Sequence, residues 1–399
     1  MNSREIIELT EKYSANNYAP LDVVLKKGQG VWVEDVDGNR YMDFLSAYSS
    51  MNFGHCNPRI VQAAHRQLDA LTIVSRAFYA ENVGLLCKEL SELTGKDKVL
   101  LMNTGAEAVE TAIKGSRKWG YEVKGVPQGK AEIIVFDGNF HGRTTTIVGF
   151  SSSELSYKNF GPFAPGFVRV PYGDAHAVES AITPNTVAVL VEPILGEGGV
   201  IIPPHGFLKS IRELCTKNNV IMIADEIWTS LGRTGKIFAC DHEDVVPDMY
   251  LMAKSLGGGI VAISAVIANS DIMKVFTPGS HGSTLGGNPF ACAIAREVLA
   301  LVREEQPDKR SAELGTYMLE RLRAMNSRYI KAVRGRGLMI GIDIDPAAGT
   351  AKDFCKKLKK EGVLCKDTHV QTIRMAPPLV MSRTDLDWGL ERVERVFAG

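Results

Sequence analysis

A lysine that follows an apolar run is the residue whose position points most directly to chemistry. Lys254 comes after the apolar residues 249–253 and shortly before three glycines at 257–259. A strand that carries a lysine into a dry site lowers the pKa of its amine and leaves the amine nucleophilic. A single lysine at a strand end is more often a surface residue, so this interpretation depends on its neighbours.

Asp225 has a corresponding position, at the end of the apolar run 220–224. A carboxylate at this level can keep a pyridinium nitrogen protonated, so that a bound heteroaromatic ring withdraws electrons. The alternative is that Asp225 and Glu226 cap a helix. Lys254 and Asp225 together favour a site that combines an amine nucleophile with a ring-binding carboxylate.

Two segments have the composition of an anion site. The sequence Asn-Thr-Gly-Ala-Glu at 103–107 opens an amphipathic helix, and the free backbone N–H groups of such a helix start suit a phosphate. The loop 280–289 is rich in hydroxyls and glycines and can present Thr284 to an anion. Ordinary helix capping and an ordinary loop remain the alternatives.

Two arginines are candidate carboxylate clamps, because guanidinium forms planar bidentate pairs with carboxylates. They are Arg143, in Asn-Phe-His-Gly-Arg, and Arg374, in Thr-Ile-Arg-Met. Either alone is more often part of a structural salt bridge. Phe140 can stack on a ring, although most such aromatics belong to the core. The spacing of His141 and His55 is not that of metal ligands, and we expect no metal site.

The sequence pattern in the middle of the chain predicts the sheet that would position these residues. Apolar runs alternate with helical periodicity, which is typical of an α/β sheet with helices on both faces. The expected strands cover residues 98–102, 131–136, 187–192, 220–224 and 249–252. Ligands collect beyond the carboxyl ends of parallel strands, so the polar residues that follow these strands are expected to meet in one crevice.

The two ends of the chain predict smaller units. Residues 28–44 read as a hairpin that turns at Asp37-Gly38-Asn39. From residue 298 onward, a long helical stretch, an apolar segment at 337–343, a second helix and a run at 370–375 predict a smaller α+β unit. We therefore expect an N-terminal segment at 1–48, a large domain at 49–297 and a small C-terminal domain at 298–399.

The composition argues against a nucleic-acid-binding or membrane protein. The chain has 399 residues, of which 45% are hydrophobic, enough for a substantial core. Lys+Arg and Asp+Glu both number 46, so no net charge draws in nucleic acid or an anionic membrane. Seven scattered cysteines indicate a reducing compartment, the cytoplasm. No stretch reaches the roughly 18 to 20 apolar residues of a membrane span. A small-molecule partner is expected.

In order and spacing, the motifs resemble those of the class III aminotransferases over nearly the whole chain. The matching segments are Asn-Thr-Gly-Ala-Glu at 103–107, Asn-Phe-His-Gly-Arg at 139–143, Asp-Glu at 225–226, Lys-Ser-Leu-Gly-Gly-Gly at 254–259 and His-Gly-Ser-Thr-Leu-Gly-Gly-Asn at 281–288. The resemblance implies a fold type I subunit, with a mixed, mostly parallel sheet in the large domain and active sites at the interface of a homodimer.

The resemblance also implies pyridoxal 5′-phosphate as cofactor. Lys254 would hold it as a Schiff base and carry the proton shift, and Asp225 would hold its pyridinium. Thr284 would join the phosphate site from the other subunit. The implied cofactor-binding residues are Gly105, Ala106, Phe140, His141, Asp225, Trp228, Lys254 and Thr284.

Further segments, at 16–21, 45–49, 102–110, 333–338 and 364–369, look like those of the ornithine aminotransferases within this family. That likeness implies transfer of the δ-amine of L-ornithine to 2-oxoglutarate. Tyr18 and Arg143 would receive the α-amino acid end of ornithine, and Tyr48 would shape that pocket. Glu197 would neutralise Arg374, then release it for the α-carboxylate of 2-oxoglutarate while Arg143 takes the distal carboxylate.

Three segments depart from the family pattern. Trp228 stands where the family usually has Gln, Leu195 replaces another Gln, and Ile-Val-Ala-Ile at 260–263 replaces an aromatic-Pro pair. All three are expected to border the cofactor. They leave open another ω-amine donor (lysine, acetylornithine or 4-aminobutyrate), an amino-acid racemase with the same cofactor, and a non-catalytic binding protein on the same fold.

Overall fold

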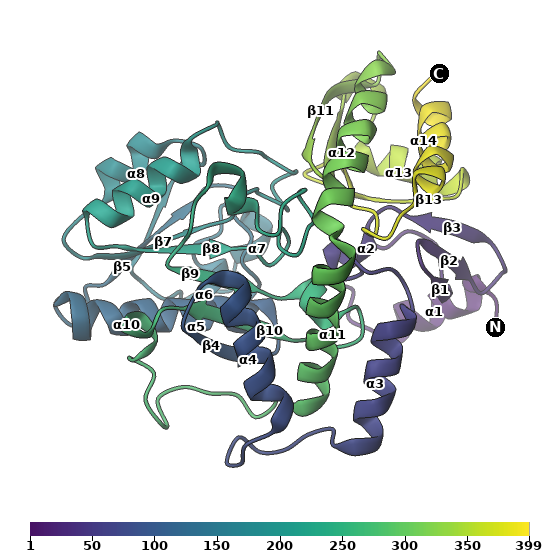
Figure 1. Cartoon of the computed structure of the whole chain (residues 1–399). Coiled ribbons are helices and arrows are strands. Elements are labelled where there is room, and N and C mark those ends of the chain that lie inside the picture. Colours follow the sequence, from purple (N-terminus) through teal and green to yellow (C-terminus); the bar gives the residue numbers. More distant parts are fainter. Residues whose placement is uncertain (399) are drawn as a thin grey trace.

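A seven-stranded sheet in the order β4-β10-β9-β8-β7-β5-β6 lies at the centre of the computed structural model, which describes residues 1–398 (Figure 1). Its strands in chain order are β4 (Lys98–Met102), β5 (Glu132–Phe136), β6 (Phe167–Val170), β7 (Thr186–Val191), β8 (Ile221–Asp225), β9 (Met249–Met252) and β10 (Ser264–Ala268). The strands from β6 to β9 pair in parallel, and β10 is antiparallel to both of its neighbours. The carboxyl ends of all strands except β10 therefore lie at one edge.

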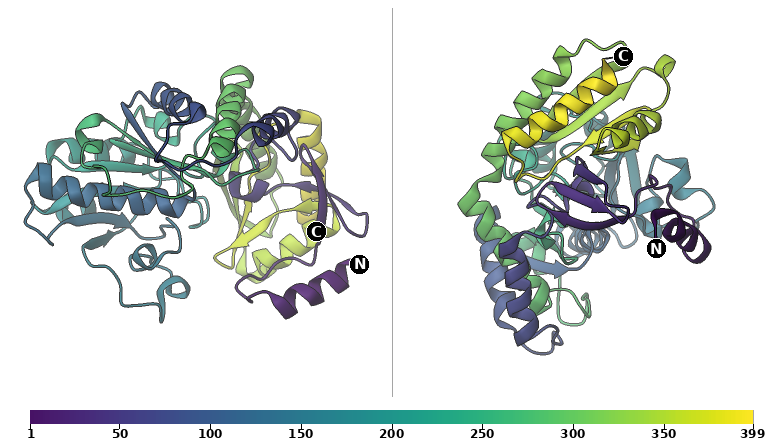
Figure 2. Two further views of the ribbon diagram at one scale, coloured as in Figure 1. Left: turned by 90° about the horizontal axis from the view of Figure 1, so that it is seen from below. Right: turned by 90° about the vertical axis from the view of Figure 1, so that its right-hand side faces the viewer.

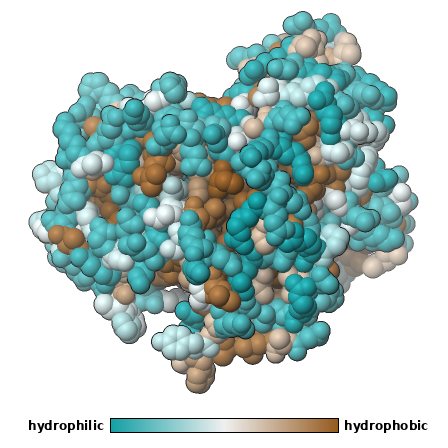
Figure 3. All heavy atoms as spheres, in the orientation of Figure 1, coloured by the Kyte–Doolittle hydropathy of each residue, from teal (hydrophilic) through white to brown (hydrophobic). Residues whose placement is uncertain are grey.

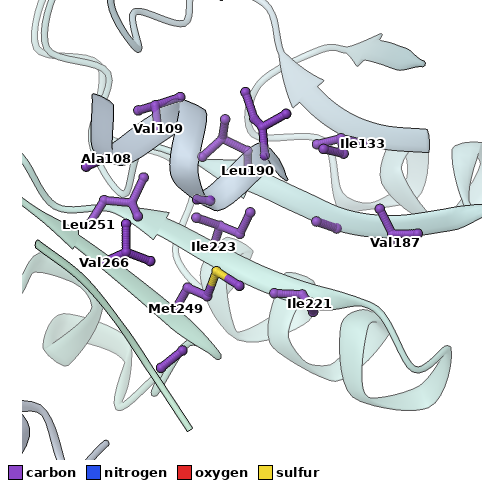
Figure 4. Packing of buried hydrophobic residues seen from close by; sticks show 14 of the residues in the cluster. Ala108, Val109, Ile133, Val187, Leu190, Ile221, Ile223, Met249, Leu251 and Val266 are labelled. Atoms are coloured by element: carbon purple, nitrogen blue, oxygen red, sulfur yellow. The ribbon is translucent and has the colours of Figure 1, made fainter. Parts of the chain in front are cut away.

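The alternation of side chains along each strand explains why both faces of this sheet are apolar. In β5, Ile133 and Val135 belong to one hydrophobic cluster, whereas Ile134 and Phe136 belong to another on the opposite face. Every residue of β7 is buried, as expected for a strand covered on both sides. Figure 4 shows the first cluster, in which strand side chains pack against Ala108 and Val109.

Helices cover the two faces in layers. On one face lies α5 (Gly105–Trp119), which packs against β9 and β10. On the other face, α8 (Ala175–Ala181) and α9 (Phe207–Lys217) contact β6, β7 and β8. The helices α3 (Pro58–Ala70), α4 (Glu81–Thr94) and α11 (Pro289–Glu305) pack together beside the β4 end. The remaining short elements of this part are η1 (Gly120–Lys124), α6 (Thr145–Val148), α7 (Glu154–Tyr157), η2 (Ala239–Glu243), η3 (Lys254–Gly257) and α10 (Ser270–Met273).

Two four-stranded sheets form the other lobe, near both chain ends (Figure 2). One contains β1 (Leu25–Gln29), β2 (Trp32–Asp35), β3 (Arg40–Asp43) and β13 (Val363–Leu364); the other contains β11 (Ile330–Arg336), β12 (Met339–Ile344), β15 (Thr372–Met375) and β14 (Lys366–Thr368). Their helices are α1 (Ser3–Tyr13), α2 (Ser46–Ser49), α12 (Pro307–Ala324), η4 (Pro346–Ala348), α13 (Ala351–Lys360) and α14 (Arg383–Phe397). Since β13 pairs with β3, and Val31, Met42 and Phe44 share one cluster with C-terminal residues, the two chain ends have a common core.

All five strands expected from the sequence are present, with ends displaced by at most one residue. The hairpin expected at 28–44 is also present, as β2 and β3. The expected α/β class with a mixed, mostly parallel sheet is confirmed. Strands β6 and β10 were not predicted. The division of the chain at residues 48 and 297 stays a prediction.

No helix among residues 1–398 has both the length and the apolarity to cross a membrane. The face drawn in Figure 3 is mostly hydrophilic, and hydrophobic residues show in patches between the polar ones.

Arg233 ties the central sheet to the other lobe. Its side chain is fully buried, and Nη1 donates to the carbonyl oxygens of Leu338 (2.8 Å) and Pro377 (2.7 Å). Nη2 donates to Ser46 Oγ (3.2 Å) and to Asn52 Oδ1. Burial lowers the pKa of the guanidinium to about 9, against the opposing effect of the Asp43 carboxylate. One side chain thereby satisfies four acceptors from three separate segments of the chain.

We expect Arg233→Met to lower the free energy of unfolding by about 3 kcal/mol or more, because buried acceptors would lose their donor. Urea unfolding measures this. Arg4→Met is the matched control, since Arg4 is 88% exposed and forms an ion pair with Glu8 on its own helix. The unfolding midpoint of this variant should barely move. Equal midpoints for the two variants would contradict the role given to Arg233.

Candidate active site

A cavity of about 530 Å³ opens at the carboxyl edge of the central sheet. Segments that follow β4, β5, β7, β8 and β9 line it, together with the loop before β10, which reaches this edge because β10 runs in the opposite direction. The lining residues with polar side chains are Ser50, Asn103, Thr104, His141, Glu192, Glu197, Asp225, Trp228, Thr229 and Lys254.

A buried pair, Asp225 and His141, lies on this edge. Asp225 ends β8, and its Oδ2 accepts a hydrogen bond of 2.6 Å from His141 Nδ1. Its other oxygen accepts the Ile227 N–H at 3.1 Å. Burial disfavours the imidazolium, but the hydrogen bond and charge of Asp225 outweigh it and raise the pKa of His141. Among residues 1–398, His141 Nε2 has no hydrogen-bond partner.

Glu192 adds a second buried carboxylate beside this pair. It follows β7 and accepts the N–H groups of Phe140 (2.9 Å) and Gly196 (3.2 Å). Burial raises its pKa to about 7, opposed by His141 and by the two backbone donors, while the charge of Asp225 raises it further. Glu192 therefore exchanges a proton near neutral pH.

Lys254 lies between the carboxylates and an indole. Its backbone has a φ of 45°, a left-handed conformation that a residue with a side chain adopts at an energetic cost of order 1 kcal/mol. Its Nζ lies 4.8 Å from the centroid of Trp228. Burial lowers the pKa of the amine, and the charges of Asp225, Glu197 and Glu192 partly oppose this. The geometry gives a lysine whose amine loses its proton more readily than usual.

An ion pair closes one side of the cavity. Glu197 Oε1 lies 2.7 Å from Arg374 Nη1, with the arginine side chain 3% exposed and the glutamate 32% exposed. Arg374 Cζ also lies 5.1 Å from the ring of Tyr48 and 5.4 Å from that of Trp228. Tyr48 sits in a run of four residues with left-handed φ angles between 43° and 71°.

The start of α5 forms the opposite side. Thr104 and Glu107 make a capping box there, which leaves the first N–H groups of the helix, those of Gly105 and Ala106, without an intrahelical acceptor. Asn103 Nδ2 donates to Ser283 Oγ at 2.9 Å, and this contact holds the loop that carries Thr284 against the helix. An anion placed before α5 would meet unpaired donors.

These residues fit pyridoxal phosphate. The start of α5 suits its phosphate, Asp225 its ring nitrogen, and Lys254 its aldehyde carbon. Two buried donor positions beside the cavity, His141 Nε2 and Trp228 Nε1, have no partner among residues 1–398. Within the same residues, no group of three or more His, Cys, Asp or Glu side chains is arranged to hold a metal ion.

The residues expected from the sequence fall into three sets. Those that line the cavity are Gly105, Ala106, Phe140, His141, Glu197, Asp225, Trp228 and Lys254. Tyr48 and Arg374 lie directly behind this wall. Three others lie outside it: Tyr18 is 75% exposed, Arg143 is exposed with its Cζ 5.5 Å from the ring of Phe140, and Thr284 is exposed on its loop. Their roles stay predictions.

Sequence reasoning missed two features of the site. Glu192 was not selected, although it ends a predicted strand in the same way as Asp225, and that position is the signal that points to it. The segment 50–51, which was not selected either, also lines the cavity. It follows a left-handed turn that contains no glycine, so its composition gives no sign of this path. Residues 260–263, which were expected to border the cofactor, line the same cavity.

The family model, a relative and two solved structures that match this chain are all aminotransferases. The model for "Aminotransferase class-III" matches residues 13–397. An ornithine aminotransferase of Geobacillus sp. (strain WCH70) is 58% identical over 395 residues, covering 99% of this chain and 98% of that protein. The ornithine aminotransferase structure from Toxoplasma gondii, with partial occupancy of PLP at its active site, superposes with a TM-score of 0.98 at 44% identity over 99% of this chain and 94% of that one. An acetylornithine aminotransferase from Elizabethkingia anophelis gives 0.90 at 44% identity, covering 100% and 99%.

We expect Glu192→Gln to stabilise the cofactor-free protein, relative to wild type, as the pH rises. An acid whose folded pKa is raised contributes stability below its unfolded pKa and loses it as the pH rises through the folded value. The difference between about 7 and the ordinary 4.5 corresponds to about 3 kcal/mol. Thermal midpoints of both proteins at about pH 5 and about pH 8 measure this. A midpoint difference that stays constant would show that Glu192 does not titrate in this range.

Proposed function

We propose that this chain, which belongs to the class III aminotransferases, transfers the δ-amino group of L-ornithine to 2-oxoglutarate. The products are L-glutamate and glutamate-5-semialdehyde, which cyclises to pyrroline-5-carboxylate. The observation that carries the proposal is the ion pair between Glu197 and Arg374 on the cavity wall. It allows one cavity to accept an ω-amine in one half-reaction and a dicarboxylate in the other.

The cofactor is pyridoxal 5′-phosphate, whose protonated ring, when bound, withdraws electrons from the carbon that carries the transferred amine. Asp225 would hold the proton on the ring nitrogen, and His141 keeps that carboxylate oriented through the 2.6 Å hydrogen bond. Gly105 and Ala106 would bind the phosphate with their backbone N–H groups. Lys254 Nζ would move the proton of the carbon that carries the transferred amine, because burial lowers the pKa of the lysine.

The state of the ion pair selects the substrate. While Glu197 neutralises Arg374, no free guanidinium is available to a carboxylate at this end of the cavity, and the δ-amine of ornithine can approach Lys254. When Glu197 turns away, Arg374 binds the α-carboxylate of 2-oxoglutarate in its place. Once 2-oxoglutarate is bound, one ion pair has replaced another, so the bound state leaves no buried charge unpaired.

The α-carboxylate and α-amine of ornithine need binding groups other than Glu197 and Arg374. We propose that Tyr18 and Arg143 bind its α-carboxylate and α-amine, with Tyr48 shaping the passage between them, and that Arg143 binds the distal carboxylate of 2-oxoglutarate. Tyr18 is highly exposed and Arg143 is exposed in the single chain, which leaves both accessible to a substrate at the cavity mouth.

A homodimer is part of this proposal. The segment 71–79 exposes Leu71 (46%), Ile73 (55%), Phe78 (68%) and Tyr79 (106%), an apolar set that a second copy of the chain would cover. Thr284, exposed on its loop, would then join the phosphate site of the other copy. We place the enzyme in the cytoplasm, on the basis of its seven scattered cysteines.

A second candidate donor is N-acetylornithine. The acetylornithine aminotransferase structure is as similar in sequence, at 44% identity, as the ornithine aminotransferase structure. The two donors differ at the α-amine, which is charged in ornithine and acylated in N-acetylornithine. The test therefore compares both.

We expect the purified enzyme to lose its visible cofactor band on addition of L-ornithine and to regain it with 2-oxoglutarate, while trapped pyrroline-5-carboxylate accumulates. Absorbance and product trapping follow the two half-reactions. Lys254→Ala should fail to complete either one, because the group that moves the proton is gone. A response to N-acetylornithine but not to ornithine would reassign the donor, and the absence of any cofactor band would refute the proposal.

We expect Glu197→Ala to lower the ratio of kcat/KM for ornithine to that for glutamate by about tenfold or more, since Arg374 would stay free to bind α-carboxylates. Glu197→Gln is the matched control for size, and it should shift the ratio in the same direction because it also lacks the charge. Stopped-flow measurement of each half-reaction gives the two constants. An unchanged ratio in both variants would contradict the switching role.

A further inference from the structure

Trp228 lies between the amine nucleophile and the substrate-selecting arginine. It follows β8 and is 7% exposed. Its ring centroid is 4.8 Å from Lys254 Nζ and 5.4 Å from Arg374 Cζ. The ring of Tyr48 meets it edge-on, with centroids 6.0 Å apart and an interplanar angle of 86°. Since Tyr48 is also 5.1 Å from Arg374 Cζ, the guanidinium has two aromatic rings and one carboxylate as neighbours.

The same indole supports the loop that carries Glu197. The backbone of Gly196 is packed so closely on Trp228 that a Cβ there would come within 1.9 Å of Cε3 and 2.3 Å of Cζ3. Behind the indole, Ile194, Val200 and Met339 form a buried cluster with it. Trp228 therefore contacts Arg374 directly and Glu197 through its neighbour, so it borders both members of the ion pair.

We propose that Trp228 determines substrate specificity by holding the guanidinium of Arg374 in place when Glu197 releases it. This inference rests on the proposed function and extends it to a residue that departs from the family pattern. After release, Arg374 loses its carboxylate, and with 3% of the side chain exposed it has little water to replace it. The aromatic rings remain, and the attraction between a cation and an aromatic ring is stronger where both are desolvated.

The consequence differs between the two substrates. Binding of a dicarboxylate requires Arg374 to be free and already oriented, and an arginine held in advance binds more tightly because less freedom is lost on binding. Ornithine reacts while Arg374 is still paired with Glu197, so its binding does not require the indole to hold a free guanidinium. Loss of the ring should therefore weaken the dicarboxylate more than the amine.

Glutarate binding to the holoenzyme tests this, because glutarate has both carboxylates of 2-oxoglutarate and no keto group to react. We expect Trp228→Leu to raise the Kd of glutarate by about three- to tenfold in isothermal titration calorimetry. Trp228→Phe, which keeps an aromatic ring, should raise it less. In the same variants, kcat/KM for ornithine should fall by a smaller factor than kcat/KM for 2-oxoglutarate.

The matched control is Trp388→Leu, which removes another indole with an arginine beside it, Arg392 Cζ at 3.3 Å. Trp388 lies on α14 and is not part of the cavity lining. This variant should leave the Kd of glutarate unchanged. Gly196→Ala provides a second route to the same result, because the new Cβ displaces the indole without removing it. Gly196→Ala should also raise the Kd of glutarate. If Trp228→Leu loses its cofactor band, Gly196→Ala and Trp228→Phe replace it in the test.

Equal glutarate affinity in wild type and Trp228→Leu would overturn the inference, as would an equal loss of ornithine and 2-oxoglutarate activity, which would indicate a general packing role. These outcomes are distinct from failure of the proposed function. If the wild type does not react with ornithine, the function fails, and glutarate binding still reports on Trp228. If it does react and glutarate binding is insensitive to Trp228, only the present inference fails.

Discussion

Ionisable side chains are buried together at the carboxyl edge of the central sheet, and the rest of the site depends on how their charges are balanced. Lys254 loses its proton more readily because it is withdrawn from water, yet the same burial would penalise an unpaired carboxylate or guanidinium. Asp225 is balanced by His141 and Glu197 by Arg374. Glu192 instead accepts two backbone N–H groups, and burial raises its pKa to about 7. A single removed charge therefore changes the environment of every other group.

The ion pair between Glu197 and Arg374 requires the two lobes to keep their relative positions. Glu197 follows a strand of the central sheet, whereas Arg374 belongs to β15 in the other lobe. Their atoms are 2.7 Å apart, so a shift of about 2 Å between the lobes would break the contact, since an ion pair needs its atoms within about 4 Å. Arg233 prevents such a shift by bonding to acceptors near residues 46, 52, 338 and 377. It also anchors the left-handed turn that places Tyr48 beside Arg374.

The sequence predicts the polar residues at the strand ends of the site better than the loop residues that line the cavity. Lys254, Asp225 and the start of α5 were found because parallel strands end at one edge, so an apolar run followed by a polar residue gives the position directly. Strand β10 was missed because Ser-Ala-Val-Ile-Ala is short and offers no alternation, and its reversed direction is what brings residues 260–263 to the cavity. Arg233 was missed because the segment around it, rich in glycine and hydroxyls, has the composition of an exposed loop. Tyr18, Arg143 and Thr284 are exposed outside the cavity lining, so their roles stay predictions.

The residues that depart from the family pattern lie on loops, whereas the polar residues at the strand ends match the pattern. A residue at a strand end is fixed by the sheet, so a change there removes the chemistry, whereas a loop residue can change size if a neighbour compensates. Trp228 introduces a large ring on one wall, and Val261 and Ala262 are small where the pattern has an aromatic residue and a proline. Both changes lie on loops of the cavity, and its strand-end groups Asp225 and Lys254 are retained. Because these changes lie on the loops, we expect them to affect which carboxylate or amine binds best, while Asp225 and Lys254 keep their positions at the strand ends.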